Sequence, residues 1–172
     1  INCYAPELKV ALGDVRELNF EDGFFDGYWS LGVIEHFYDG YGLILREAYR
    51  VLKKGGYFFV TVPVISWLRR QKVRMGKYSE YNESENIKER FFQFAFDSKQ
   101  LIKHFHAKNF KLVKSEPIDG IKGLKDEIPL FKPVLQPLYD SNYFPVRIIK
   151  KVIDILIRPF ANHVMLFIFK KI

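Results

Sequence analysis

Alternating apolar and polar blocks between Phe24 and Pro63 predict a strand, a helix and a second strand. Residues 25–31 are aromatic and apolar and follow the turn signal Glu21-Asp22-Gly23, which is typical of the start of a strand. Residues 57–62 form a continuous apolar run that Pro63 ends, as expected of a parallel strand covered on both faces. Two parallel strands joined by a helix form a crossover unit, so this stretch predicts an α/β fold.

The helix expected between these strands has one apolar face. Its apolar residues recur at helical spacing, and they are Tyr41, Ile44, Leu45, Ala48, Val51 and Leu52. The opposite face carries Arg46, Glu47, Arg50, Lys53 and Lys54. We expect Asp39 to cap this helix by accepting from its free backbone N–H groups, and Gly55 to end it in the left-handed conformation.

Further strands and a helix are expected on either side of this unit. Residues 8–12 predict a short strand that ends at Gly13-Asp14. Asp97 is placed to cap a helix over residues 98–108, and Asn109 to end it in the left-handed conformation. Residues 110–117 and 163–169 each predict a strand.

The segment 120–162 contains several prolines that interrupt long helices, and then a strongly amphipathic stretch at 146–158. Its apolar face carries Ile149, Val152, Ile153 and Leu156, and its other face is mainly basic. We favour a helix that packs on its own sheet or forms a lid over a substrate. The alternative is peripheral contact with an anionic membrane surface, which the basic residues would suit.

The ordered motifs of the chain resemble those of class I S-adenosylmethionine-dependent methyltransferases. They are Gly13-Asp14, Phe25-Asp26, Glu35-His36, Arg46-Glu47, Arg50-Val51-Leu52, Lys54-Gly55-Gly56 and Phe110. The closest likeness is to the group that acts on small molecules, quinones and lipids. The resemblance implies a partial Rossmann-like sheet of parallel strands, with a final antiparallel strand inserted beside the last parallel one.

The resemblance also implies that residues 1–172 are the C-terminal part of one methyltransferase domain with a lid-like insertion at 120–162. The family's glycine-rich cofactor loop and its ribose-binding acid precede the matched region, and the one G-x-G of this sequence, Gly40-Tyr41-Gly42, lies in the loop before the expected helix and is not that cofactor loop. Backbone N–H groups of such a loop approach the cofactor closely. We therefore expect the chain by itself to bind S-adenosyl-L-methionine weakly or not at all, and to be inactive.

Four cofactor-binding residues follow from the resemblance. Asp14 would contact the adenine amino group and the backbone N–H of Val15 the adenine ring, while Leu31 and Gly32 would pack against adenine and the methionine part. Gly32 lets backbone approach a ligand without a Cβ in the way. Taken without the family, the Gly13-Asp14 pair favours a solvated turn aspartate.

His36 is the candidate catalytic residue. An imidazole can take a proton from the acceptor as the methyl group transfers. The alternative is that His36 caps its loop by holding Glu35 or a backbone carbonyl, because alignment alone suffices for many methyl transfers. We expect no metal site, since Gly32 stands where the related small-RNA methyltransferases place their first metal-binding Glu.

Net charge and cysteine content bear on the binding partners and on the cellular compartment. The chain has 172 residues, enough for one domain, and its 27 basic and 20 acidic residues give a net charge of +7, which favours anionic partners. Nucleic acid is not favoured, because four glutamates follow the basic stretch at 69–77. One cysteine indicates a reducing compartment, and no signal or membrane-spanning segment is evident, so we expect a cytoplasmic protein.

Together these features predict methyl transfer from S-adenosyl-L-methionine to a small-molecule or lipid-like acceptor, by an enzyme of which this chain is part. The alternative is a methyltransferase-like module that has lost catalysis and serves in binding or as a scaffold. The sequence leaves open the acceptor, the methylated atom and the oligomeric state.

Overall fold

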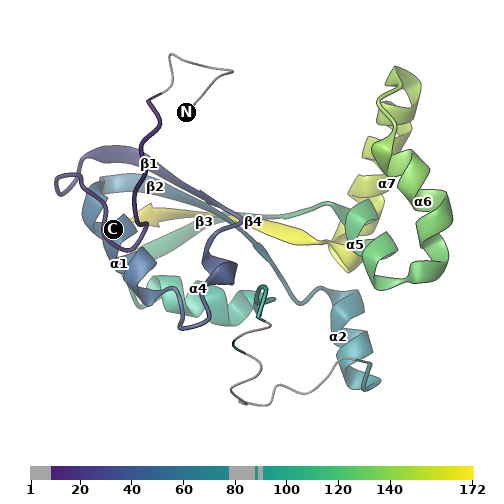
Figure 1. Ribbon diagram of the computed structural model, residues 1–172, viewed down its shortest axis with the longest axis horizontal. Helices are drawn as coiled ribbons and strands as arrows, with labels where there is room; N and C mark the ends of the chain where they lie inside the picture. The colour runs from purple at the N-terminus through teal and green to yellow at the C-terminus, as the bar shows by residue number, and fades with distance from the viewer. Residues whose placement is uncertain (1–8, 78–87, 89–90) are drawn as a thin grey trace.

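A computed structural model describes residues 9–77, 88 and 91–172 of the chain. Within them it forms a four-stranded sheet with strand order β1-β2-β4-β3, flanked by helices (Figure 1). The elements in chain order are β1 (Phe25–Leu31), the 3-10 turn η1 (Ile34–His36), α1 (Gly42–Val51), β2 (Leu52–Pro63), α2 (Trp67–Arg74), α4 (Ser98–His106), β3 (Phe110–Ile118), α5 (Gly120–Glu127), the 3-10 turn η2 (Pro129–Phe131), α6 (Lys132–Asp140), α7 (Phe144–Ala161) and β4 (Val164–Lys171).

The sheet combines one parallel pair with an antiparallel final strand. β1 pairs with β2 in parallel, with Tyr28 opposite Phe58 and Ser30 opposite Val60. β4 lies between β2 and β3 and runs antiparallel to both. The predicted α/β fold class, with a last strand inserted beside the last parallel one, is therefore confirmed.

The connection from α1 into β2 differs from the prediction. The helix begins after Tyr41, so Asp39 lies two residues before the capping position; its carboxylate pairs with Lys88 at 2.9 Å instead of capping. Gly55 does adopt the left-handed conformation, with φ +80°. It lies inside β2, however, in an irregularity where the register passes from Phe25–Leu52 to Gly27–Tyr57, and the helix ends earlier.

The predicted signals around α4 are confirmed. Asp97 accepts from the backbone N–H groups of Lys99 and Gln100 at 2.9 and 3.1 Å, which satisfies two donors at the helix start. Asn109 has φ +61° and turns the chain into β3. Both depend on neighbouring residues alone, which is why the sequence predicts them.

The hydrophobic core lies between one face of the sheet and helices α1 and α4 (Figure 1). The Phe105 ring of α4 stacks on Phe169 of β4 with 4.0 Å between centroids. The opposite face of the sheet is open in the described part of the chain: Trp29 of β1 stacks on Phe59 and is 64% exposed. The expectation that β2 is covered on both faces is thus met on one face only.

Helices α5, α6 and α7 form a separate group beyond the end of the sheet, and α2 lies at the same end (Figure 1). Since β1 and β2 are parallel and α2 follows β2, this is the end at which the two parallel strands finish. The predicted amphipathic helix at 146–158 is confirmed as the central part of α7. Its apolar residues Ile149, Val152 and Leu156 are exposed, so that face does not pack on the sheet.

Candidate functional site

The carboxyl end of β1 forms an open glycine corner. Gly32 has φ +68°, a backbone conformation that residues with a side chain rarely adopt. Its N–H donates to the carbonyl of Thr61 at 3.2 Å. A Cβ built on Gly32 would have Glu35 Oε1 as its nearest neighbour, at 3.6 Å. Leu31 beside it is 53% exposed. Backbone at this corner is therefore accessible to a ligand, as the sequence predicts for Leu31 and Gly32.

Asp14 lies in an exposed turn rather than at the end of a strand. The predicted strand at 8–12 is wrong for the described residues 9–12, which have no ladder partner, and Leu12 is fully exposed. The Asp14 carboxylate accepts from the Arg16 guanidinium at 2.6 and 2.9 Å. The side-chain bond from Arg16 lowers the pKa of Asp14 from 3.8 to about 2, so the carboxylate stays ionised at mildly acidic pH as well.

The segment that carries Asp14 is tied to α1 by two polar residues. Glu47 Oε1 accepts from the backbone N–H of Leu18 at 2.7 Å. Arg50 donates to the carbonyls of Leu18 and Phe20 at 2.9 and 2.7 Å and to Asp22 at 2.8 Å. Sequence reasoning placed Glu47 and Arg50 on a polar helix face and missed this role, because the partners lie about thirty residues away. Val15 of the same segment is half-buried against the core.

His36 ends the short turn η1 and is held by the chain opposite. Its Nδ1 lies 2.7 Å from the carbonyl oxygen of Phe92, and its ring meets the Phe92 ring edge to face at 5.2 Å. A carbonyl can only accept, so Nδ1 carries the proton and a neutral ring presents Nε2 as its basic nitrogen. The bond to a backbone carbonyl is the loop-anchoring role expected as the alternative for His36. The other ring nitrogen, Nε2, could still act as a base.

His36 and the Asp14 turn face one hollow. The Arg16 guanidinium lies 5.7 Å from the centroid of the Phe37 ring, which brings the two segments together. The hollow has a volume of about 560 Å³, and its lining includes Arg16, His36, Phe37, Asp39, Arg46 and Lys108. Of the five residues that the sequence assigned to the site, only His36 lines it; Asp14 is connected to it through Arg16, and Leu31 and Gly32 lie outside it.

Glu35 is the residue of this region that sequence reasoning undervalued. It is 3% exposed, and its Oε2 has no hydrogen-bond partner within the described residues. Burial raises the pKa of this carboxyl above its ordinary value of 4.5. No group of three His, Cys, Asp or Glu side chains comes together anywhere in the described ranges, so Glu35 and His36 have no third metal ligand there.

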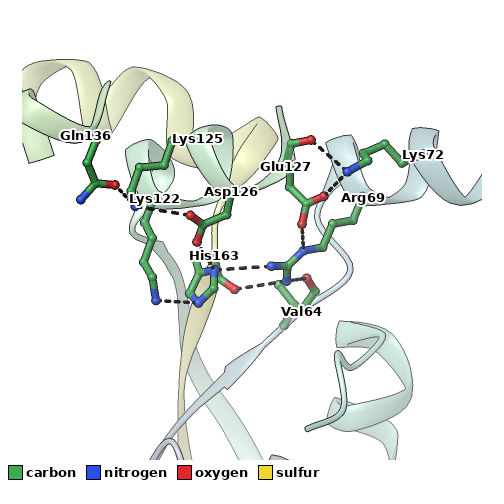
Figure 2. Close-up of polar contacts among 9 residues, drawn as sticks. All are labelled: Val64, Arg69, Lys72, Lys122, Lys125, Asp126, Glu127, Gln136 and His163. Carbon is green, nitrogen blue, oxygen red and sulfur yellow. Dashed lines mark hydrogen bonds and ion pairs between the residues drawn. The ribbon is translucent and has the colours of Figure 1, made fainter. Parts of the chain in front are cut away.

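A second polar cluster joins the end of β2 to the distant helices (Figure 2). Glu127 at the end of α5 accepts from Arg69 of α2 at 2.7 Å and from Lys72 at 2.8 Å. Arg69 also donates to the carbonyl of Val64 at 2.9 Å. The contact spans 58 residues of sequence, and nothing local in the chain predicts it.

His163 lies in the same cluster at the start of β4. Its Nε2 is 2.9 Å from the ammonium of Lys122, and its Nδ1 is 3.4 Å from the Arg69 guanidinium and 3.8 Å from Asp126 (Figure 2). Burial, followed by the charges of Lys122 and Arg69, lowers the pKa of His163 below 6.5. The ring is therefore neutral at pH 7, and Nε2 can accept from Lys122.

Beside this cluster lies a small apolar hollow of about 300 Å³. It is lined by Pro63, Ile65, Val73, Phe94, Arg69 and Glu127. The chain segment 91–96 contacts both this hollow and the His36 turn, since Phe94 lines the hollow, the carbonyl of Phe92 accepts from His36, and the N–H of Phe94 donates to the carbonyl of Glu35 at 2.9 Å. One segment of chain thus supports both the candidate base and the wall of this hollow.

Comparison with solved structures places this arrangement among known folds. A SAM-dependent methyltransferase from Archaeoglobus fulgidus matches 98% of this chain over 70% of its own length, with a TM-score of 0.58 and 19% identity. The chain has the class I methyltransferase fold. In addition, the family model for a methyltransferase domain matches residues 2–60, which contain Asp14, Leu31, Gly32 and His36. The predicted resemblance to the class I methyltransferase family is confirmed.

Two other solved structures match the chain with similar TM-scores. A possible histamine N-methyltransferase from Thermotoga maritima matches with a TM-score of 0.50 and 20% identity, over 93% of this chain and 62% of its own. The [4+2]-cyclase SpnF matches with a TM-score of 0.51 and 17% identity, over 94% and 54%. The chain therefore spans about half to two thirds of the length of these methyltransferase-fold proteins. No curated protein sequence matches it.

Proposed function

We propose that the protein transfers a methyl group from S-adenosyl-L-methionine to a small-molecule or lipid-like acceptor. The observation that carries this proposal is the left-handed Gly32 at the carboxyl end of β1, within the segment that matches the methyltransferase domain. Ligands of open α/β sheets bind at this end of the strands. S-adenosyl-L-methionine, when bound, supplies an activated methyl group on a sulfonium sulfur.

The proposed cofactor contacts are made by two parts of the chain. Leu31 offers an exposed apolar side chain and Gly32 an unobstructed backbone. The Asp14 carboxylate, held by Arg16, can accept a hydrogen bond from the adenine amino group. The backbone N–H of Val15 is assigned to the adenine ring.

His36 is the proposed general base. Nδ1–H donates to the Phe92 carbonyl, which fixes the ring and its tautomer, and Nε2 can accept the proton that the acceptor loses as its O, N or C is methylated. We assign the acceptor to the apolar hollow beside the 91–96 segment, with Glu127 of the 120–162 insertion in its wall. Because most of its lining is apolar, we expect an acceptor that is at least partly apolar.

Tritium transfer tests this assignment. Full-length protein is incubated with methyl-labelled S-adenosylmethionine and a mixture of lipids and small metabolites, and label in the solvent-extractable fraction is counted. His36→Asn keeps a donor for the Phe92 carbonyl but removes the basic nitrogen, so we expect label transfer to fall by about 10²–10⁴-fold. His106→Gln on α4, outside the hollow, is the matched control and should transfer label normally.

The outcome for His36→Asn separates two roles. Near-normal label transfer in this variant, with loss in His36→Ala, would assign His36 to anchoring the loop and would contradict its role as the general base.

The second candidate function is a catalytically inactive binding or scaffold module. It is favoured by the fold likeness to a cyclase, because a fold does not fix a reaction. Cofactor binding without label transfer to any fraction would support that candidate.

A further inference from the structure

Helix α7 turns its polar side toward the protein. Asp154 accepts from the backbone N–H of Ile121 in α5 at 3.0 Å, and Arg158 pairs with Glu116 of β3 at 3.2 Å. Lys150 donates to the carbonyl of Tyr139 at 2.7 Å. Three polar residues that would normally face water in an amphipathic helix are therefore used for contacts inside the molecule.

The apolar side of α7 faces outward along its whole length. At about 3.6 residues per turn these side chains occupy one continuous arc of about 160°. Large side chains of this arc that are more than half exposed are Phe144, Ile148, Ile149, Val152, Leu156 and Phe160. A surface of this size and continuity is more than scattered exposed residues account for, and it indicates a contact. We call it the outer face of α7.

An aromatic side chain of α2 extends this face. The Trp67 ring meets the Phe160 ring edge to face, with 6.4 Å between centroids, and Trp67 is 57% exposed. The N-terminal end of α7 carries a second exposed aromatic pair, Tyr143 and Phe144. Aromatic side chains at both ends of an apolar helix face are typical of helices that lie at a membrane interface.

The charges beside the outer face are of one sign. α7 has one acidic residue, Asp154, and it is turned inward onto α5. The exposed charged residues of α7 are the basic Arg147 and Lys151, which line a hollow beside the inward-facing Asp154. A second copy of this face would bring like charges together, whereas anionic lipid headgroups complement them.

We propose that the outer face of α7 docks on an anionic membrane surface, with the helix lying in the interface plane. None of the helices in the described ranges is long and apolar enough to cross a bilayer, which is consistent with a helix that lies on the surface. The proposal does not rest on methyl transfer, because it needs neither the cofactor nor His36. It would, however, bring the acceptor hollow beside α2 close to lipid.

Vesicle sedimentation tests the docking. Full-length protein is centrifuged with vesicles of phosphatidylcholine alone or of phosphatidylcholine with phosphatidylglycerol, and we expect binding to the mixed vesicles that weakens at high salt. Ile149→Ser together with Leu156→Ser should weaken partitioning roughly tenfold or more, since both side chains would be buried in lipid. Val113→Ser is the matched control, because Val113 is equally exposed but lies on the sheet.

Trp67 supplies a second readout. In a Trp29→Phe background, Trp67 is the remaining tryptophan of this sequence, and its emission should shift to shorter wavelength when anionic vesicles are added. Arg147→Glu with Lys151→Glu should abolish the preference for anionic vesicles. Absence of vesicle binding by the wild type would overturn the proposal. So would a dimer that Ile149→Ser with Leu156→Ser dissociates, which would assign the outer face to contact between copies.

Discussion

Two buried glutamates of this chain lie in opposite electrostatic surroundings. Glu47 receives hydrogen bonds from the Arg50 side chain and from the backbone of Leu18, and the bond from Arg50 is the main cause of its lowered pKa. Glu35 is buried, its Oε2 has no hydrogen-bond partner among the residues that the structure describes, and burial raises its pKa. The ionised form is therefore stabilised by folding at Glu47 and destabilised by folding at Glu35.

We predict that Glu35→Gln stabilises the protein at neutral pH by about 1 kcal/mol, because it removes a buried charge without a partner. The folded pKa of Glu35 lies above the unfolded value of 4.5, so the folded state binds more protons between these two values. Stability of the wild type should fall as pH rises through that window, and the advantage of Glu35→Gln should vanish below pH 4.5.

Urea denaturation at neutral pH and below pH 4.5 measures this difference. Glu47→Gln is the matched control and should have the opposite sign, with loss of stability at neutral pH, because it breaks the Arg50 and Leu18 contacts. A destabilised Glu35→Gln at neutral pH would show that the carboxylate has a favourable partner in solution, and would contradict this account of Glu35.

Single-residue predictions succeeded where the cause was local. Asp97 and Asn109 act on backbone within a few residues of themselves, so the sequence contains the whole reason for their roles. The prediction that Asp39 caps α1 was wrong by two positions, because the exact start of a helix depends on the packing of the loop before it. The Arg69–Glu127 pair could not be predicted, since it exists only once α2 and α5 are brought together in space.

At the scale of elements, two glycines allow α5 and α7 to pack closely. A Cβ on Gly123 would overlap the carbonyl oxygen of Ala161, and one on Gly120 would overlap the backbone of Arg158. The two helices therefore touch backbone to backbone, which is possible only without side chains at these positions. This contact orients α7, and so it fixes which of its faces turns outward.

We predict that Gly123→Ala separates α5 from α7 and destabilises the helical group by about 1–3 kcal/mol, the usual effect of overpacking. Hydrogen exchange should quicken across α5 and α7 while the sheet keeps its protection. Gly42→Ala is the matched control, because a Cβ on Gly42 meets no atom within 4 Å. Unchanged exchange in α5 and α7 of the Gly123→Ala protein would contradict the close packing.

Most elements could be predicted from their periodicity, but the direction of α7 could not. Its spacing correctly indicated an amphipathic helix, and an apolar face is ordinarily the buried one. In α7 the polar face is turned inward instead, because Asp154 and Arg158 bind polar partners on α5 and β3 that lie far away in sequence. Residues 9–12 failed for a related reason: within the described part of the chain they have no neighbouring strand to pair with.

At the scale of the whole molecule, Leu31 and Gly32 lie at the end of the sheet where β1 and β2 finish. The sequence correctly predicted that these two strands are parallel, and parallel strands joined by a helix finish at the same edge. It also named Gly32 and His36, which follow β1 directly. It could not predict that Arg16, the partner of Asp14, would line one hollow with His36, because the contact between Arg16 and Phe37 forms only in space.

Calorimetric titration of the full-length protein with S-adenosylhomocysteine tests the central proposal most directly. Asp14→Ala should weaken binding by about tenfold or more, as expected when a hydrogen bond to a charged group is lost, while His36→Ala should change it by less than about twofold. Asp22→Ala, which also removes an exposed aspartate paired with an arginine, is the matched control and should bind normally. Absence of binding by the wild type, or equal loss in Asp14→Ala and His36→Ala, would contradict the assignment of Asp14 to the cofactor and His36 to the acceptor.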